Sequence, residues 1–400
     1  MVVKTQIAIV GFAILLGMGC TLQKDANEVS AAEQQDTFAS SNGLVELTEN
    51  TEYETIRVVE VAGELEHPWS FAFLPDGQIL VTERSGRLNL LANGEVTEIT
   101  GIPDLQTQGQ GGLLEVSVHP NYEETGWIYL TYSKPNGNGE TATDLARGRL
   151  ERTTLIDVED IFVQNRYSQP GRHYGSRLAW TTDGKLLMTI GDRGAEPPRA
   201  QDLTDHAGSL LRLNDDGSVP EDNPFVDNDE ALDEIYAYGL RNIQGMIVDP
   251  ATNEIWVTDH GPRGGDELNR IEPGNNYGWP LVTLGLDYGT EDLFPDAVAR
   301  RMEGLTEPFY EFLPTHAPSG LALITADRFP AWQGNLLVGG LRSERIRRVV
   351  FDDSEVLHEE ELLLGKIGRI RDVREAPDGT IYVLTDESNG GLYRIEPDNG

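Results

Sequence analysis

The sequence repeats one strand–turn–strand pattern six times, and this repeat limits the possible folds more than any other feature. Each copy has a short apolar strand, a turn rich in Pro, Asp and Gly, and a second strand that ends in a polar or glycine-rich loop. The turns lie about 45 to about 80 residues apart. The copies start at Phe71, Val116, Leu178, Met246, Leu321 and Val373.

These spacings match or exceed the length of a four-stranded propeller blade. Long helical periodicity is nearly absent, which argues against an α/β barrel and against a doubly wound sheet. We therefore predict an all-β fold, a six-bladed β-propeller with four-stranded blades, over residues 53–400. The strand around 54–62 is expected to complete the last blade, because ring closure leaves only short strand edges.

The first 20 residues are typical of an export signal. Lys4 precedes an apolar run over residues 7–18, which is shorter than the about 20 residues that a membrane-spanning helix needs. Cys20, the one cysteine of the chain, follows this run and resembles the lipidated N-terminus of a bacterial lipoprotein; plain cleavage of the signal is the alternative. We predict an exported protein of the periplasm or cell envelope, without a disulfide in its folded part.

Residues 21–52 are polar and acidic, a composition that buries too little apolar surface to order itself, so we predict a disordered tether here. The whole chain has 67 Asp and Glu against 31 Lys and Arg, a net charge of −36. Nucleic acid is held by clustered cations, so this balance excludes nucleic-acid partners. The same negative charge disfavours binding to an anionic membrane surface, so a lipid anchor is the expected membrane contact.

Two candidate sites stand where a loop enters a repeated strand. His173 lies in QPGRHYGSRLAW, and an imidazole there can take a proton from a substrate hydroxyl near neutral pH. A purely structural histidine fits this position equally well. Arg241 and Asn242 lie in YGLRNIQG and can bind a carboxylate or a quinone oxygen, although a surface Arg paired to an acid is the simpler interpretation.

The segment 259–280 (DHGPRGGDELNRIEPGNNYGWP) is rich in oxygen ligands. The Gly261-Pro262 step favours extended backbone, whose carbonyls can face one cavity and bind a hard cation such as Ca²⁺. Glu267 and the turn that ends at Tyr277 supply further oxygens. A plain solvated loop remains the alternative for each residue taken singly.

Arg369 and Arg371 alternate on one strand and therefore point to the same face. Two like charges repel there unless an anion lies between them. That anion is either a ligand or an ordinary carboxylate of this acidic chain. Arg342 is a third cation at a strand end.

Several motifs together resemble one family. In chain order they are GQGGLLEVSVHP, RHYGSRL, YGLRNIQG, DHGPRGGDELNRIEPGNNYGWP, PTHAPSG and RIRDV. They are similar to motifs of the soluble pyrroloquinoline-quinone (PQQ) dehydrogenases, the glucose/sorbosone dehydrogenase family, and closest to its aldose sugar dehydrogenase branch. The resemblance runs from about residue 60 to the end, and the members of this family are six-bladed propellers.

The resemblance implies oxidation of aldose sugars at C1 to the lactone, with electrons passed from PQQ to an external acceptor. His173 would be the general base, and Arg241 would stabilise negative charge on the quinone oxygen. A Ca²⁺ at the cofactor would be bound by the carbonyls of Gly261 and Pro262, and a second, structural Ca²⁺ by Glu267 and the Tyr277 carbonyl. The contacts to PQQ would come from Gln110, Arg241, Asn242, Thr315, Arg342, Arg369 and Arg371.

Three positions depart from the glucose-dehydrogenase pattern. Arg172 replaces an Asp, Leu313 an aromatic residue and Arg342 a Lys. The departures at Arg172 and Leu313 leave the identity of the sugar substrate open, whereas Arg342 keeps the positive charge of the Lys that it replaces. Two other functions stay possible: a non-enzymatic binding propeller, which predicts loss of the motif residues, and a Ca²⁺-dependent lactonase-type hydrolase, which predicts a metal held by carboxylate and Asn side chains at the ring centre.

Overall fold

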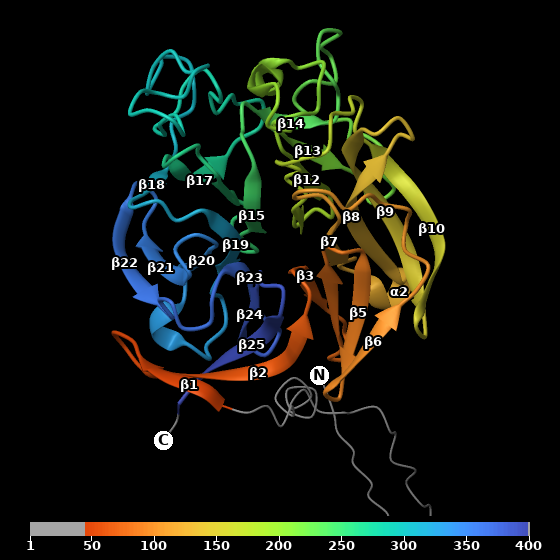
Figure 1. Ribbon diagram of the computed structural model, residues 1–400, viewed down its shortest axis with the longest axis vertical. Helices are drawn as coiled ribbons and strands as arrows, with labels where there is room; N and C mark the ends of the chain where they lie inside the picture. The colour runs from red at the N-terminus through yellow and green to blue at the C-terminus, as the bar shows by residue number, and fades with distance from the viewer. Residues whose placement is uncertain (1–44, 399–400) are drawn as a thin grey trace, which may run out of the picture.

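Six antiparallel sheets stand around a central axis, so the predicted six-bladed β-propeller is confirmed (Figure 1). The structure is a computed structural model that describes residues 45–398. The predicted export signal and most of the predicted tether lie outside the described residues. No helix within residues 45–398 is long and apolar enough to cross a membrane.

The blades follow one another in chain order, and their first strands line the axis. Blades 1 and 2 contain β3 (Pro68–Phe73), β4 (Ile79–Glu83), β5 (Arg87–Ala92), β6 (Glu95–Ile99), β7 (Leu113–Val118), β8 (Trp127–Pro135), β9 (Thr141–Glu151) and β10 (Thr154–Val163), with α2 (Tyr122–Thr125) after β7. Blades 3 and 4 contain β11 (Leu178–Trp180), β12 (Leu186–Ile190), β13 (Ser209–Leu213), β14 (Ile235–Tyr238), β15 (Ile243–Val248), β16 (Ile255–Asp259), β17 (Asp266–Ile271) and β18 (Tyr310–Phe312), with a 3₁₀ turn η1 (Pro197–Gln201) after β12. Blades 5 and 6 contain β19 (Pro318–Leu323), β20 (Leu336–Gly340), β21 (Arg345–Phe351), β22 (Val356–Leu362), β23 (Ile370–Glu375), β24 (Ile381–Thr385), β25 (Gly390–Pro397), β2 (Thr55–Leu65) and β1 (Val45–Asn50), with a 3₁₀ turn η2 (Pro330–Trp332) after β19.

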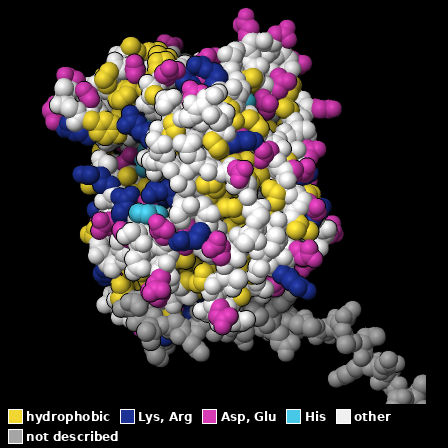
Figure 2. Space-filling view, turned by 45° about the vertical axis from the view of Figure 1, so that its right-hand side comes forward, with side chains coloured by type: hydrophobic (Ala, Val, Ile, Leu, Met, Phe, Trp, Pro, Cys, Tyr) yellow, Lys and Arg dark blue, Asp and Glu magenta, His cyan; other side chains and the backbone are white. Residues whose placement is uncertain are grey.

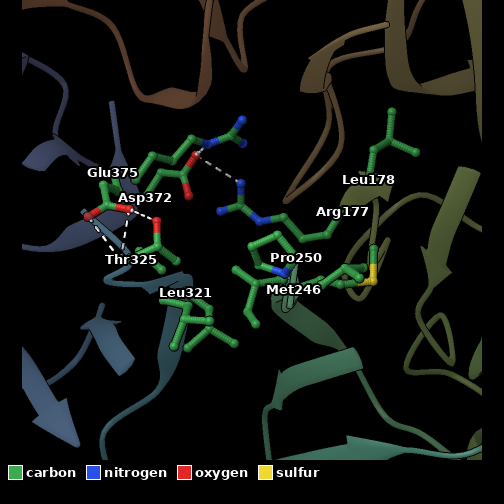
Figure 3. A pocket seen from close by; sticks show the side chains of 13 residues that line it. Arg177, Leu178, Met246, Pro250, Leu321, Thr325, Asp372 and Glu375 are labelled. Atoms are coloured by element: carbon green, nitrogen blue, oxygen red, sulfur yellow. Dashed lines mark hydrogen bonds and ion pairs between the residues drawn. The ribbon is translucent and has the colours of Figure 1, made fainter. Parts of the chain in front are cut away.

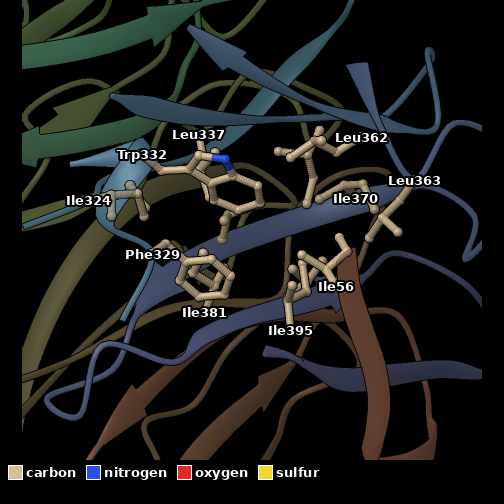
Figure 4. Packing of buried hydrophobic residues seen from close by; sticks show 14 of the residues in the cluster. Ile56, Ile324, Phe329, Trp332, Leu337, Leu362, Leu363, Ile370, Ile381 and Ile395 are labelled. Atoms are coloured by element: carbon tan, nitrogen blue, oxygen red, sulfur yellow. The ribbon is translucent and has the colours of Figure 1, made fainter. Parts of the chain in front are cut away.

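A cluster of buried apolar side chains lies between each pair of neighbouring blades. Figure 4 shows the cluster between blades 5 and 6, where the Phe329 and Trp332 rings stack with centroids 4.7 Å apart. Ile381 of β24 and Ile56 of β2 pack against them. Because each sheet is apolar on both faces, it needs a neighbour on both sides, and a closed ring satisfies every blade.

The N-terminal strand closes the ring, as predicted. β2 pairs antiparallel with β25 in the last blade. The prediction of four strands per blade is wrong for blade 6, where β1 pairs with β2 as a fifth strand. The predicted disordered tether is therefore wrong for residues 45–50.

Charge pairing explains why this acidic segment is ordered. Glu49 accepts hydrogen bonds from the Lys366 ammonium at 2.8 Å and from the Leu363 amide at 3.1 Å. Glu52 pairs with the buried Arg348 guanidinium at 2.9 Å and with His358 at 2.8 Å. Composition alone could not reveal these partners, which lie about 300 residues away in the sequence.

Antiparallel pairing decides where a site can form. In each blade the first strand begins at the same edge at which the second strand ends. The loop residues before β7, β11, β15 and β23 therefore gather on one face with those that follow β12, β16 and β24. The long segment 272–309 begins beside the outer edge of β14, where Tyr277 N–H donates to Tyr238 O, and reaches the same face at Trp279.

We expect Glu52→Gln to lower the free energy of unfolding by about 1 kcal/mol, because it removes one charged partner of the buried Arg348. Urea unfolding at neutral pH measures this loss. Glu60→Gln, on the neighbouring strand β2, is the matched control and should change stability by less than about 0.5 kcal/mol. Equal stability of the two variants would show that the pair does not secure the N-terminal segment.

Candidate active site

A cavity of about 250 Å³ opens where the strand-entry loops meet, and every blade contributes to its wall. Of the predicted site residues, Gln110, Asn242, Arg369 and Arg371 line it. The other lining residues are Trp69, Arg84, Leu114, Tyr174, Gly175, Gln244, His260, Leu341 and Asp386. On the face shown in Figure 2, acidic side chains are spread widely, whereas basic ones gather around a histidine at the left.

His173 lies directly beside this cavity. Its backbone N–H donates to Gln110 Oε1 at 2.8 Å, and its Nδ1 lies 2.6 Å from Asp192 Oδ1. Burial lowers the pKa of His173 below its usual value, although the Asp192 carboxylate acts in the opposite direction. The imidazole is therefore neutral near pH 7, and with Nδ1 bound to Asp192, Nε2 is left to exchange a proton.

The backbone at His173 is held in an unusual conformation. Its φ is +58°, in the left-handed region that costs a non-glycine residue energy. Gly191 permits this arrangement, because a Cβ at that position would lie 2.2 Å from the His173 carbonyl oxygen. The buried Arg193 donates to the Arg172 carbonyl at 2.8 Å, and its guanidinium lies 3.5 Å from the Tyr174 ring centroid.

Asp192 was not predicted from the sequence. Its carboxylate is fully buried and also accepts hydrogen bonds from Trp279 Nε1 at 2.7 Å and from the Gly194 amide at 2.7 Å. It lies just after the second strand of its repeat, as does Asp386, and Asp259 is the last residue of that strand in its own repeat, so an acidic residue recurs at this point of the pattern. That recurrence was a readable signal for these residues.

Asp259 holds the Arg241–Asn242 pair. Its carboxylate accepts the backbone N–H of Arg241 at 2.8 Å and that of Asn242 at 2.6 Å. Burial raises the pKa of Asp259 to about 6. The Arg241 guanidinium donates to the carbonyls of His260 at 3.0 Å and Gly261 at 2.9 Å, and its Nε has no partner among the described residues.

The predicted calcium ligands are only partly brought together. The Gly261 carbonyl already accepts from Arg241, so the guanidinium supplies positive charge next to the Gly261-Pro262 step. Burial, with the nearby Asp259 carboxylate as the next cause, raises the pKa of Glu267 to about 8. Tyr277 lies on the edge of blade 3, whereas Glu267 lies in β17 of blade 4. Within residues 45–398 no three acidic, His or Cys side chains form a ready metal site.

The anion between Arg369 and Arg371 is a carboxylate of the chain. Asp386 accepts from Arg371 at 2.7 Å, Arg369 at 3.3 Å and His67 at 3.0 Å. Of the two alternatives left open by the sequence, the ordinary carboxylate is present. Arg371 Nε still has no partner among the described residues. Arg342, which is exposed, and Thr315, which is half-buried, do not line the cavity.

Comparison with known proteins identifies the lineage. A sequence profile of the glucose / sorbosone dehydrogenase family matches residues 65–394. The chain belongs to the glucose/sorbosone dehydrogenase family. It is similar to the aldose sugar dehydrogenase YliI of Escherichia coli, with 38% identity over 86% of this chain and 94% of that protein. The resemblance predicted from the motifs is thus confirmed.

Solved structures of similar proteins have the same fold. The apo form of the soluble aldose sugar dehydrogenase from Escherichia coli aligns with a TM-score of 0.82 and 38% identity, over 86% of this chain and 99% of that one. A PQQ-bound aldose sugar dehydrogenase from Streptomyces coelicolor aligns with a TM-score of 0.69 and 25% identity, over 85% of this chain and 98% of that one.

We expect Asp192→Asn to lower the pKa of His173 further, because the substitution removes the carboxylate that favours the imidazolium. NMR titration of the histidine ring protons, assigned with His173→Gln, measures this pKa. Asp183→Asn changes an acid on the same blade that does not contact His173, and it should leave the titration in place. An unchanged His173 pKa in Asp192→Asn would contradict the pairing.

Proposed function

We propose that this protein oxidises aldose sugars at C1 to the lactone, with PQQ as its bound cofactor and an external acceptor for the electrons. The observation that carries the proposal is the His173–Asp192 pair beside an arginine-lined cavity. Its relatives support it, since they include an aldose sugar dehydrogenase and a PQQ-bound one.

The cavity fits a flat, polyanionic ligand. Arg84, Arg369 and Arg371 supply positive charge, and Trp69 and Tyr174 supply aromatic wall. The Arg369 guanidinium, on a side chain that is 41% exposed, can donate to a ligand carboxylate. Bound here, PQQ would supply a quinone that accepts a hydride.

In this proposal His173 takes the proton of the sugar hydroxyl at Nε2, while Asp192 keeps the ring oriented through Nδ1. Arg241 adds positive charge beside the site, and its guanidinium is fixed by two carbonyls and lies 5.1 Å from the Trp279 ring centroid. The neutral state of the buried imidazole makes it competent as a base at neutral pH, so activity should fall as the pH drops below His173's pKa.

Calcium is part of the proposal at two places. The carbonyls of Gly261 and Pro262 would bind the cofactor-linked ion, with Arg241 sharing the Gly261 oxygen. Glu267, with Asp259 and Glu311 as charged neighbours, would bind the structural ion together with the Tyr277 carbonyl. Oxygen ligands of this kind suit Ca²⁺, and a cation would relieve the repulsion among these carboxylates.

The two rival functions are less well supported. The lactonase-type hydrolase requires a metal held by side-chain carboxylate and Asn at the ring centre, whereas Glu115 there is paired with Arg177 at 2.9 Å. The binding propeller predicts loss of the motif residues, but His173, Arg241 and the Gly261-Pro262 step are all present.

The predicted lipoprotein signal extends the proposal to location. An exported protein held by lipid at Cys20 would work at the cell envelope, where a membrane-associated or soluble acceptor could take the electrons. Labelling with a radioactive fatty acid, compared between the native chain and Cys20→Ser, tests the anchor.

Reconstitution tests the activity. The purified protein with Ca²⁺ and PQQ should reduce an artificial dye in the presence of an aldose. His173→Ala should lower turnover by roughly 10²-fold or more while PQQ still binds, because only the base is lost. His358→Ala, a surface histidine on β22, is the control and should keep full turnover. Absence of dye reduction with every aldose tested, and no rise in melting temperature with PQQ, would refute the proposal.

Calcium should stabilise the protein more strongly at higher pH. Because the pKa of Glu267 is raised to about 8, ionisation of this group costs the metal-free protein stability as the pH rises from its usual pKa towards 8. A bound cation reverses that cost, so the rise in melting temperature on adding CaCl₂ should be larger above pH 8 than at about pH 6. Glu267→Gln should abolish this difference, and Glu254→Gln in the same blade should retain it. A pH-independent rise would argue against Glu267 as a ligand.

A further inference from the structure

A group of buried charges fills the propeller axis beneath the candidate cofactor cavity. Arg177, which precedes β11, lies 2.9 Å from Glu115 and 3.1 Å from Asp372. Arg374 contacts the same two carboxylates, at 2.5 Å and 2.9 Å. Arg177, Glu115 and Asp372 are at least 97% buried. The group joins β7, β11 and β23, which belong to three different blades.

Arg177 also holds the floor of the cavity. Its Nε donates to the Gln244 carbonyl at 2.6 Å, and its Nη2 donates to the Arg371 carbonyl at 3.0 Å. Its guanidinium lies 4.3 Å from the centroid of the Trp69 ring. Gln244, Arg371 and Trp69 line the cavity and come from β15, β23 and β3. One planar side chain thus contacts three wall residues, on β15, β23 and β3.

Arg374 contacts the same two carboxylates but does not line the candidate cofactor cavity. Its other contacts are the Ser70 hydroxyl at 3.0 Å and the face of the Phe71 ring at 5.3 Å. It lines a second cavity of about 330 Å³, which Arg177 and Asp372 also line. Figure 3 shows Arg177 and Asp372 pointing toward each other there. The charged group therefore lies between the two cavities and separates them.

We propose that Arg177 is a positioning residue for cofactor binding: through the Gln244 and Arg371 carbonyls and the Trp69 ring it sets the geometry of the cavity floor. This inference rests on the proposed function. Fixing the Arg371 backbone matters because its side chain meets both Asp386 at 2.7 Å and Gln244 Oε1 at 3.0 Å. Only a guanidinium has enough planar donors for two carboxylates and two carbonyls while its flat face lies against an aromatic ring.

Arg177→Lys tests the inference, because it keeps the positive charge opposite Glu115 and Asp372 and removes the planar fork. PQQ binding to the metal-loaded protein is measured by quenching of tryptophan fluorescence, and the melting temperature is measured without PQQ. We expect PQQ affinity to fall by about 10-fold or more, the usual effect of losing a residue that orients a ligand-binding group. Arg374→Lys, the matched control, should change affinity by less than about 3-fold.

A double-variant cycle separates positioning from general destabilisation. If Arg177 acts through Arg371, Arg177→Lys should cost clearly less affinity in an Arg371→Lys background than in the native chain. An effect that follows only the melting temperature would be equal in the two backgrounds. Should Arg177→Lys fold too weakly, both Lys variants are compared in sucrose, an osmolyte that stabilises the folded state without restoring the planar fork.

The outcomes distinguish this inference from the proposed function. If the native protein binds no PQQ, both are overturned. If the native protein binds PQQ but the Arg177 and Arg374 variants lose affinity equally, the positioning role is wrong and the proposed function stands. A selective loss in the Arg177 variant, with coupling to Arg371, supports the role.

Discussion

Every blade of this ring has two apolar faces, and only its two neighbours can cover both of them. The clusters between blades meet this need, from the stacked Phe329 and Trp332 rings of blade 5 to the aliphatic side chains of blades 1 and 2. Covering both faces forces the first strands together around one axis. Polar side chains line the space left at the axis. Buried ion pairs and the candidate cofactor cavity occupy it in place of an apolar core.

Acidic residues do two opposite things in this chain. Over the surface they outnumber the basic residues, whereas at the candidate active site single carboxylates each contact a defined partner. Asp192 orients His173, Asp259 holds the backbone of Arg241 and Asn242, and Asp386 pairs with two arginines. These buried acids hold the site residues in defined positions.

The period of the repeat was enough to predict the blades, because strand and turn chemistry is local. The family motifs likewise placed Gln110, Asn242, Arg369 and Arg371, which the structure brings to one cavity. Asp192 and Asp386 were missed, although acids recur at this point of the repeat, because the sequence does not reveal which basic side chain each one meets in the fold. The order of residues 45–50 was missed for the same reason, since composition records the charge of Glu49 but not the lysine opposite it.

The closing pair of strands also determines the order of events in folding. Ile56 near the start of the folded chain pairs with Pro397 near its end, so this contact spans almost the entire described sequence. Contacts of such long range form late, after the loop entropy of the whole chain has been overcome. β2 can form a local hairpin with β1, but its other edge has no partner until β25 is in place. Until the ring closes, this strand edge and the apolar faces between blades 6 and 1 stay uncovered, so an incomplete ring exposes surfaces that favour aggregation.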